Sequence, residues 1–331
     1  MKKKAIALIS GGLDSLLAAK VIMKQGIPVE GVVFLMPFAS RDIRAYTERV
    51  RQSADEADIP IKFIDMSEKF LEILKSPNHG YGANLNPCID CKILMLKLAK
   101  DIMKRENAGF IITGEVLGER PMSQRKDALD IIRKKSSLDG YLLRPLSAKL
   151  LEETVPETEG VVDRNRLLDF VGRGRSKQLA LAKKYSLTKF FAPSGGCLLT
   201  DKIFTRKLKD LINSDTLDFN NIALLKRGRH FRLDKGTKTI VGRDEKDNMN
   251  ILELKQKKDV LLRLKDDPGP YVLLRGIVSF QNIKKAANLL LAHSKSKQAG
   301  SAVVEYWMNE ENKKELQSCA MDRDKIDHLR I

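Results

Sequence analysis

The stretch that decides the fold is KAIALISGGLDSLLAAKVIMKQG, residues 4–26. Its beginning, KAIALIS (4–10), is a short apolar run typical of a buried strand. LLAAKVIMKQG (16–26) is predicted to form a helix that ends at Gly26. The turn SGGLDS (10–15) joins the two directly, so we expect a β-α unit with a glycine pair at the carboxyl end of its strand.

The same alternation continues along the next hundred or so residues. Helical periodicity fills two longer stretches between the later strands, at 41–59 and 92–107. Strands alternating with helices of this length predict an α/β fold with a doubly wound parallel sheet, whose ligands bind at the carboxyl ends of the strands. The further predicted strands are VEGVVFLMP (29–37), PIKFIDMS (60–67) and AGFIITGE (108–115).

The pattern changes after about residue 140. A loop-rich region is followed by a helix from about Ser176, and then by the punctuating segment APSGGCLLTD (192–201). Short β-rich pieces come next, followed by helical segments such as QNIKKAANLLLAHSK (281–295). A chain of 331 residues usually forms two domains. We therefore predict an α/β domain at 1–203 and a smaller α+β domain at 204–331.

The chain is strongly basic, with 60 Lys and Arg against 43 Asp and Glu and a formal net charge of +17. Residues 1–200 carry 33 basic and 24 acidic side chains, and residues 201–331 carry 27 and 19. The excess is therefore shared by both parts, which favours a polyanionic partner such as a nucleic acid. A Lys-rich thermophile surface without a ligand remains the alternative.

The N-terminal sequence MKKKAIALISGG has no signal-peptide features, because its apolar run is too short and leads into a glycine turn. No segment has the roughly 18 apolar residues of a membrane-spanning helix. We therefore expect a cytoplasmic protein without a membrane partner. Thiols stay reduced there, so four cysteines point to metal binding or catalysis before disulfides.

A glycine pair between a strand and a helix forms an anion nest, where the backbone and the helix N-terminus attract phosphate. SGGLDS lacks the spacing of both the Walker loop and the G-x-G-x-x-G dinucleotide fingerprint. An ordinary tight βα turn is the simpler explanation. Its position after the first strand favours the phosphate role.

SGGLDS resembles the pyrophosphate loop of the PP-loop ATPases, which cleave ATP to AMP and pyrophosphate. TGEVLGERPMSQ (113–124) is similar to the Gly-Glu segment of tRNA 4-thiouridine synthases. NPCIDCK (86–92) and SGGCLLTD (194–201) are similar to the cysteine segments of tRNA 2-thiouridylases and of iron–sulfur-dependent tRNA thiolation enzymes. The segments stand in the expected order, and the resemblance runs from residue 4 to about residue 205.

This resemblance implies an ATP-dependent tRNA sulfurtransferase. A uracil carbonyl is a poor electrophile, and adenylation of its oxygen creates a leaving group that sulfide or a persulfide can displace. Gly114 and Glu115 would lie beside the adenylate, and Asp14 would act through Mg²⁺. The ATP phosphates would be held by Ser10, Gly11, Gly12, Asp14 and Ser15.

The remaining question is the use of the cysteines. Cys88 and Cys91 lie one helical turn apart, and Cys197 follows 106 residues after Cys91. Cys319 has no cysteine neighbour and is expected to be a thiol on a helix face. A redox pair would need a thioredoxin-like context, and a structural zinc site would need a fourth ligand, for which His79 is a weak candidate.

Two uses of the three cysteines fit the resemblance. In ordinary 2-thiouridylases two cysteines pass a persulfide, and the residue three before the first of them is commonly Asp. Here that position is Cys88. The departure favours a 4Fe-4S cluster on Cys88, Cys91 and Cys197, whose open fourth iron can deliver sulfide, over a persulfide relay.

Basic segments indicate where RNA would bind. GRGRSKQ (172–178) opens a helix with cations and suits either a phosphate or a solvated helix start. KRGRHFRLDKGTKTIVGR (226–243) interleaves cations with Phe231, which is more simply a core residue than a base-stacking one. GRHFRL, IVGR and PGPYVLLRG also resemble the RNA-binding domain of NFACT-type proteins.

We therefore predict a tRNA sulfurtransferase that uses ATP, Mg²⁺ and a 4Fe-4S cluster, with tRNA and a sulfur donor as partners. Neither the thiolated position, the choice between 2-thio and 4-thio, nor a homodimer is decided by the sequence. No sign of the THUMP domain that usually accompanies 4-thiouridine synthases is present. The alternatives are the persulfide relay, a small-molecule amidating or ligase-type PP-loop enzyme, and a non-catalytic RNA-binding protein with structural zinc.

Overall fold

The computed structural model describes residues 3–192, 197–296 and 300–331. The chain divides into two compact units, Met1–Thr200 and Asp201–Ile331. This division precedes the predicted boundary by three residues, because Asp201 caps the first helix of the second unit by accepting a hydrogen bond from the N–H of Phe204.

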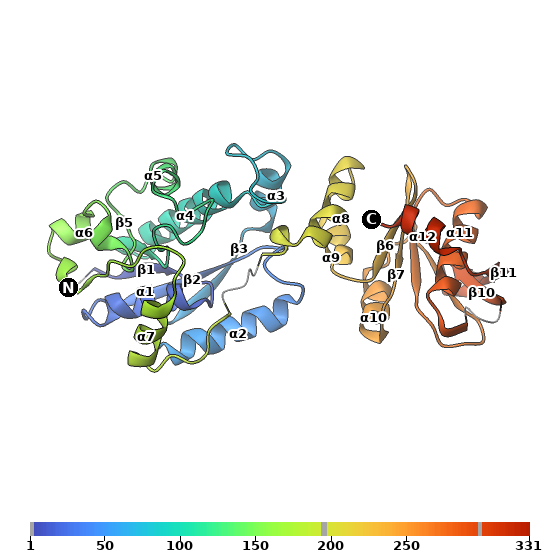
Figure 1. The fold of residues 1–331 in the computed structure, drawn as a ribbon, viewed down its shortest axis with the longest axis horizontal. Helices are drawn as coiled ribbons and strands as arrows, with labels where there is room; N and C mark the ends of the chain where they lie inside the picture. Colours follow the sequence, from blue (N-terminus) through green and yellow to red (C-terminus); the bar gives the residue numbers. More distant parts are fainter. Residues whose placement is uncertain (1–2, 193–196, 297–299) are drawn as a thin grey trace. The chain divides into compact units, whose positions relative to one another are not determined.

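The first unit is built on a five-stranded parallel sheet of order β3-β2-β1-β4-β5 (Figure 1). Ala5 pairs with Val29 on one side and with Phe110 on the other, so β1 is the central strand. The chain runs outward from β1 and returns to β4 on its other side, which creates a topological switch point between these two strands. The predicted doubly wound sheet is confirmed. Its strands are β1 (Ala5–Leu8), β2 (Val29–Leu35), β3 (Ile61–Asp65), β4 (Phe110–Thr113) and β5 (Leu142–Leu143).

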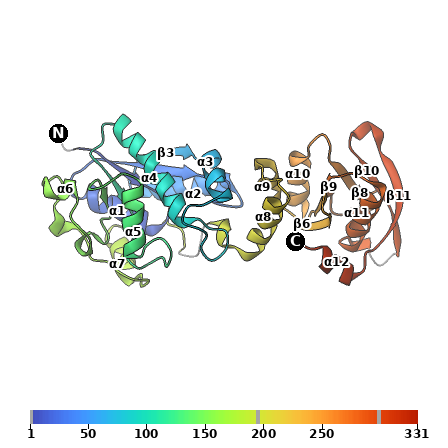
Figure 2. The same ribbon diagram turned by 90° about the horizontal axis from the view of Figure 1, so that it is seen from above.

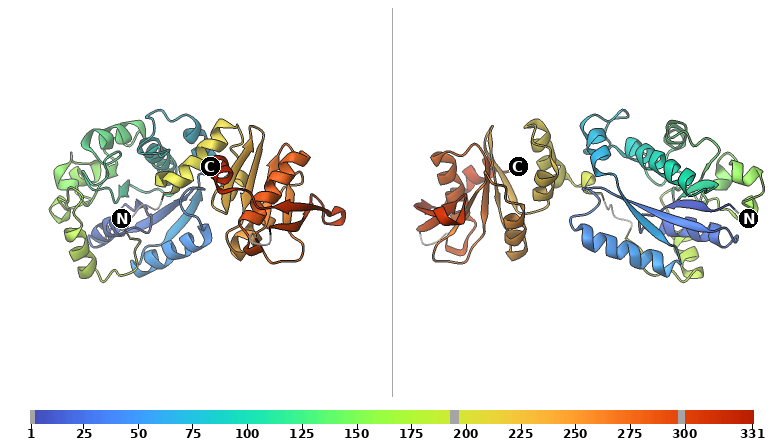
Figure 3. Two further views of the ribbon diagram at one scale, coloured as in Figure 1. Left: turned by 45° about the vertical axis from the view of Figure 1, so that its right-hand side comes forward. Right: turned by 180° about the vertical axis from the view of Figure 1, so that it is seen from behind.

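Helices cover both faces of this sheet. In Figures 1 and 3, α4 and α5 lie on one face with α3 beside them, whereas α1, α2 and α7 lie on the other. Figure 2 shows α4 and α5 in front of the strands. The helices are α1 (Leu13–Met23), α2 (Ile43–Glu56), α3 (Ser67–Lys75), α4 (Cys88–Arg105), α5 (Lys126–Lys135), α6 (Val155–Thr158) and α7 (Ser176–Lys184).

The distribution of apolar residues along each helix matches how deeply the helix is buried. α1 is apolar on nearly all sides and is buried from Leu13 to Ile22, because it packs against both the sheet and α7. α2 is strongly charged and buries only Val50, Ser53 and Ala54. The packing of α1 fixes its first turn against the carboxyl ends of the strands.

The second unit has a separate antiparallel sheet of order β11-β10-β8-β9-β7-β6 and, among its described residues, five α-helices. Successive residues of a strand face opposite sides of the sheet, so Leu262 packs beneath α11 whereas Leu261 joins the cluster around Trp307. The elements are α8 (Lys202–Asn213), α9 (Phe219–Leu225), β6 (Arg229–Asp234), β7 (Thr237–Val241), α10 (Glu245–Leu254), β8 (Val260–Leu264), β9 (Val272–Gly276), α11 (Phe280–Ala292), β10 (Ser301–Trp307), β11 (Lys314–Cys319) and α12 (Arg323–Leu329).

Two expectations for this unit are corrected. The helix expected at 281–295 is confirmed as α11, but only helices were expected beyond it, whereas SAVVEYW and KELQSC form the antiparallel strands β10 and β11. Cys319 therefore ends a strand and is exposed, and it does not lie on a helix. Phe231 is fully buried in the core, as the sequence predicted. Within the described residues, no helix is long and apolar enough to cross a membrane.

Candidate functional site

The SGGLDS segment forms a tight loop between β1 and α1. Gly11 has φ +74°, a left-handed conformation that favours glycine, and an added Cβ there would lie 2.7 Å from the ring of Phe191. The N–H of Phe191 donates to the carbonyl of Gly11 at 2.9 Å. Gly12 and Phe191 also form a parallel bridge. Phe191, for which the sequence predicted no role, therefore packs against the loop.

Two serine hydroxyls hold the loop in shape. Ser15 Oγ donates to the carbonyl of Gly12 at 2.8 Å, and the N–H of Ser10 donates to Ser15 Oγ at 3.2 Å. The N–H of Gly12 donates to Ser10 Oγ at 3.4 Å. Gly12 is also the N-cap of α1, and no described side chain caps that helix. The N–H groups of its first turn are therefore directed at any anion in the loop.

Gly114 brings the end of β4 against this first turn. A Cβ added at Gly114 would lie 2.4 Å from both the carbonyl carbon of Asp14 and the backbone nitrogen of Ser15. No other residue fits without moving backbone. The two motifs that the sequence placed at strand ends are thus in direct contact.

Glu115 is buried, with 1% of its surface exposed, and it is held by charged neighbours. Arg144 Nε donates to Glu115 Oε2 at 2.9 Å, and Thr113 Oγ1 donates to the same oxygen at 3.1 Å. Lys92 Nζ lies 3.6 Å from Glu115 Oε1. Burial alone would raise the pKa of Glu115, but Lys92 and Arg144 outweigh it and hold the pKa below its ordinary value.

Asp14 lies in the first turn of α1 beside two arginines. Its Oδ2 is 3.8 Å from the guanidinium of Arg175, and its Oδ1 is buried without a hydrogen-bond partner among the described residues. Burial raises the pKa of Asp14, although Arg175 and Arg120 act in the opposite direction. The same surroundings raise the pKa of Glu119, through burial and then through the charge of Asp14.

The arginines reach Asp14 because two loops are joined. Leu117 and Val171 form a parallel bridge, and the N–H of Gly172 donates to the carbonyl of Leu117 at 2.7 Å. This contact joins TGEVLGERPMSQ to GRGRSKQ, which the sequence treated as separate segments. The sequence assigned no role to Arg144, which stands outside every motif, or to Lys92, which ends NPCIDCK. Only the fold shows that each pairs with Glu115.

Two of the three predicted cysteines lie at the start of α4, and the third lies in a segment held near that helix. Cys88 and Cys91 lie in the first turn of this helix, and Cys197 immediately precedes a short 3-10 helix, Leu198–Thr200. This segment is held near α4 because Asn84 Nδ2 donates to the carbonyl of Thr200 at 2.9 Å. The glycines of the predicted SGGCLLTD turn lie outside the described residues.

Cys91 is buried, whereas Cys88 and Cys197 are half-buried, and the thiols are close enough to affect one another. Burial is the main reason that the pKa of Cys91 is raised, and the nearby Cys197 and Cys88 thiols raise it further. Burial also raises the pKa of Cys197 to about 11. Within the described part of the chain, no three His, Cys, Asp or Glu side chains are grouped as around a bound metal ion. His79 is hydrogen-bonded, with Nδ1 2.8 Å from Asp90 Oδ1.

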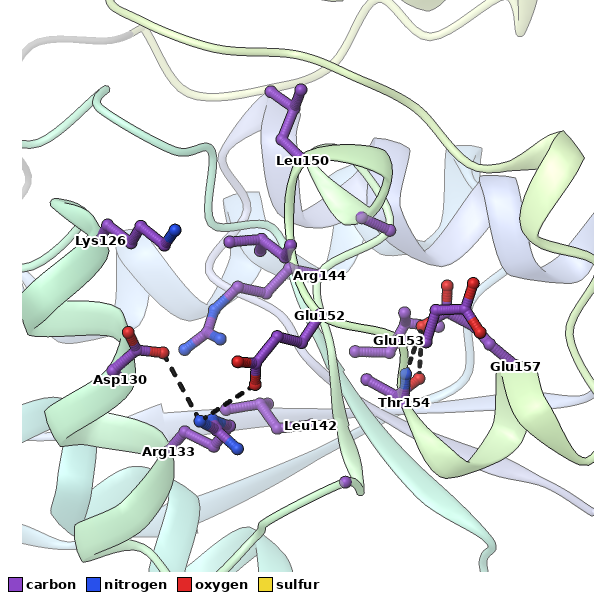
Figure 4. A pocket seen from close by; sticks show the side chains of 14 residues that line it. Lys126, Asp130, Arg133, Leu142, Arg144, Leu150, Glu152, Glu153, Thr154 and Glu157 are labelled. Carbon is purple, nitrogen blue, oxygen red and sulfur yellow. Dashed lines mark hydrogen bonds and ion pairs between the residues drawn. The ribbon is translucent and has the colours of Figure 1, made fainter.

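A cavity of about 80 Å³ lies between α5, β5 and the start of α6 (Figure 4). Its charged lining is paired, because Arg133 lies 3.6 Å from Asp130 and 3.4 Å from Glu152. Nucleotide-sized pockets are usually about 300–1,000 Å³. The cavity holds a few water molecules at most, and we do not assign a ligand to it.

Two family models match the chain. Residues 1–155 match the family described as thiamine biosynthesis protein (ThiI). Residues 228–330 match the NFACT protein RNA binding domain. Both matches agree with the resemblances found in the sequence.

Two curated relatives each match less than half of the chain. A probable tRNA sulfurtransferase of Anoxybacillus flavithermus is 30% identical over 146 residues, which are 43% of this chain and 35% of that protein. The tRNA-specific 2-thiouridylase MnmA of Desulfotalea psychrophila is 36% identical over 110 residues, 32% of this chain and 31% of that protein. The chain thus spans about a third of the length of these relatives.

Among solved structures, the U34-tRNA thiolase NcsA from Methanococcus maripaludis with its [4Fe-4S] cluster aligns with 14% identity and a TM-score of 0.34. The alignment covers 68% of this chain and 70% of that one. At this score the likeness carries no argument about function.

Proposed function

We propose that this chain, which joins a ThiI-family domain to an NFACT-type RNA-binding domain, is an ATP-dependent tRNA sulfurtransferase of the cytoplasm. One observation carries the proposal: the cysteine helix and the anion loop meet at one edge of the sheet. Lys92, the neighbour of Cys91, pairs with Glu115 at 3.6 Å. Gly114, the residue before Glu115, packs against the backbone of Asp14. Groups for nucleotide binding and sulfur chemistry are therefore close together.

The reaction has two steps. The uridine carbonyl oxygen attacks the α-phosphorus of ATP. The bond between this phosphorus and the oxygen that bridges to the β-phosphate breaks, and pyrophosphate leaves with that oxygen. A sulfur nucleophile then attacks the activated carbon, and the C–O bond breaks so that the oxygen departs with AMP. The first turn of α1 would hold the phosphates, because its N–H groups are uncapped by any described side chain.

Asp14 fits the role of a Mg²⁺ ligand. Its Oδ1 is buried without a hydrogen-bond partner in the described structure, and a buried oxygen of this kind is stabilised by a cation. Mg²⁺ would neutralise phosphate charge there. Ser10 and Ser15 would act by keeping the loop in shape, since their hydroxyls bond within it.

The three thiols fit the donor set of a 4Fe-4S cluster. Thiolates are the usual ligands of such clusters, and three of them leave one iron open. Cys91 is affected by the thiols of both Cys88 and Cys197, and burial raises the pKa of Cys91 and of Cys197, which favours neutral thiols at these two positions unless a cation is bound. The cluster would supply bound sulfide to the activated uridine. A persulfide relay through the same cysteines is the second candidate, since it also uses cysteines that lie close together.

The second unit would bind the tRNA. It carries 27 basic against 19 acidic side chains, and its family model is that of an RNA-binding domain. Its role would be to hold the tRNA while a uridine enters the first unit.

Product release tests the proposal directly. The full-length protein is incubated with ATP and Mg²⁺, with and without bulk tRNA, and AMP and pyrophosphate are measured. We expect tRNA to stimulate both, and Asp14→Asn to abolish the stimulation while Cys319→Ser keeps it. A protein that releases AMP without any effect of tRNA would instead be a small-molecule ligase. No release at all would leave a non-catalytic RNA-binding protein.

Sulfur delivery needs a separate measurement. After anaerobic purification we expect iron and acid-labile sulfide in the wild type and in Cys319→Ser, and a loss of both in Cys88→Ser, Cys91→Ser and Cys197→Ser. A colourless, iron-free preparation that still thiolates tRNA would exclude the cluster and favour the persulfide relay. Mass spectrometry of the tRNA nucleosides identifies the thiolated uridine.

A further inference from the structure

Arg175 is a largely buried cation with few partners. It is the residue before α7, and its side chain is only 16% exposed. Its one ion pair among the described residues is with Asp14 Oδ2 at 3.8 Å, and its Nε is buried without a hydrogen bond. A guanidinium carries five N–H donors, and leaving one of them unpaired in the interior is costly. Such a group is suited to a ligand that accepts several hydrogen bonds.

The surroundings of Arg175 indicate which ligand. It lies against the anion loop, where the first turn of α1 also directs its N–H groups. Arg120 is close enough to act on Asp14 in the same direction as Arg175. The acidic groups facing the two arginines are Asp14 and Glu119. The two carboxylates offset the charge of the two arginines, so the number of donors decides the ligand. The guanidinium of Arg175 and the N–H groups of α1 together suit an anion with many oxygen acceptors, as a polyphosphate has.

The other cations of GRGRSKQ are placed differently. Arg173 is exposed. Lys177 pairs with Asp169 at 3.2 Å and lies over the ring of Phe170. Of the three, Arg175 alone reaches the loop, so the motif contributes one buried guanidinium, and the other two cations lie at the surface.

We propose that Arg175 binds the pyrophosphate part of ATP, with its guanidinium fork on the β- and γ-phosphates. This inference rests on the proposed function and names a residue of the same site. In the structure described here Asp14 holds the guanidinium at the loop. A phosphate that accepts two parallel N–H bonds replaces this single long contact with stronger ones. Arg175 would then bind the leaving group of adenylation, where negative charge increases.

The test compares affinities for ATP, pyrophosphate and AMP in the full-length protein, measured by calorimetry. For Arg175→Ala we expect about tenfold to hundredfold weaker binding of ATP and of pyrophosphate, as for loss of a charge-assisted hydrogen-bonded pair. AMP should bind as to the wild type, because it lacks the two phosphates concerned. Arg175→Lys keeps the positive charge but loses the two parallel N–H groups. Its affinity for ATP and for pyrophosphate should therefore lie between those of the wild type and of Arg175→Ala.

Arg173→Ala is the matched control, since it removes an arginine of the same motif from the surface, and its affinities should not change. Thermal unfolding shows whether each variant is folded, and Arg175→Lys replaces Arg175→Ala if the alanine variant is not. If the wild type binds ATP and both Arg175 variants bind it equally well, the inference is wrong while the proposed function stands. Equal losses for ATP and AMP would also overturn it. A wild type that binds neither ATP nor pyrophosphate would contradict both.

Discussion

Gly114 and Asp14 are 100 residues apart in the sequence, yet an added Cβ on one would lie 2.4 Å from the backbone of the other. The sequence identified both as candidate ligand-binding residues because each follows a predicted strand, and strand ends meet at one edge of a parallel sheet. It did not identify Arg175 as their neighbour. That contact depends on how two loops meet at Leu117 and Val171, and no periodicity encodes such a meeting.

The close approach at Gly114 gives a sharp prediction. Gly114→Ala should destabilise the first unit by about 1–3 kcal/mol, as overpacking does, because backbone atoms of α1 must move. The variant should also lose ATP binding, since the displaced turn carries the N–H groups directed at the phosphates. Thermal unfolding and calorimetry measure the two effects.

Gly174→Ala is the control for this substitution. An added Cβ at Gly174 meets no atom within 4 Å, so this variant should behave as the wild type in both measurements. Equal behaviour of the two alanine variants would show that the contact at Gly114 is not needed for nucleotide binding.

At the scale of the elements, prediction succeeded where a segment is buried on a regular face. The first four strands of the parallel sheet and α1, α2 and α4 follow from apolar runs and helical spacing. β5 has only two residues and gave no signal. β10 was missed, although SAVVEYW is rich in the β-branched and aromatic residues of a strand. β11 is mostly exposed and charged, so its pairing with β10 decides its conformation.

The start of α11 is a specific candidate for RNA contact. Phe280 is 63% exposed and Ile277 is 66% exposed, in a region that also exposes Lys284, one helical turn after Phe280. If RNA binds there, Phe280→Ala should lose one base-stacking contact, worth about 1–3 kcal/mol. Fluorescence anisotropy with labelled tRNA at fixed salt measures the affinity.

Phe219 provides a matched comparison for Phe280. It is also the first residue of a helix after a capping side chain, and it is 44% exposed. Phe219→Ala should leave tRNA affinity unchanged. If the two variants bind tRNA equally well, RNA binds elsewhere on the unit.

At the scale of the whole molecule, the sequence shows two units but not which groups control the stability of each. The single tryptophan, Trp307, is buried in the second unit against Leu224 and Ile240. Its fluorescence therefore reports on this unit alone. Close by, His230 is fully buried, and its Nε2 lies 3.1 Å from the carbonyl of Leu224. Burial, followed by the charges of Lys238 and Lys207, lowers the pKa of His230 well below 6.5.

This histidine predicts how the second unit responds to acid. Below about pH 6.5 the unfolded chain binds a proton at His230 that the folded unit does not bind, so stability decreases as the pH falls. The loss should approach about 1.4 kcal/mol per pH unit for this one group. Urea unfolding followed by Trp307 fluorescence at pH 7.5 and pH 5.5 measures it. His230→Gln, which keeps an N–H donor, should flatten the dependence, and an unchanged slope would assign it to other groups.

The contact between Phe191 and the glycine loop has a consequence for synthesis on the ribosome. All five strands of the parallel sheet have been translated by residue 143, but Phe191 comes 48 residues later. At about 5–20 residues per second, roughly two to ten seconds of elongation separate the two events. A nascent chain stalled in this interval contains the whole sheet but lacks Phe191 and Cys197. Translation therefore completes the scaffold of the first unit before it completes the site.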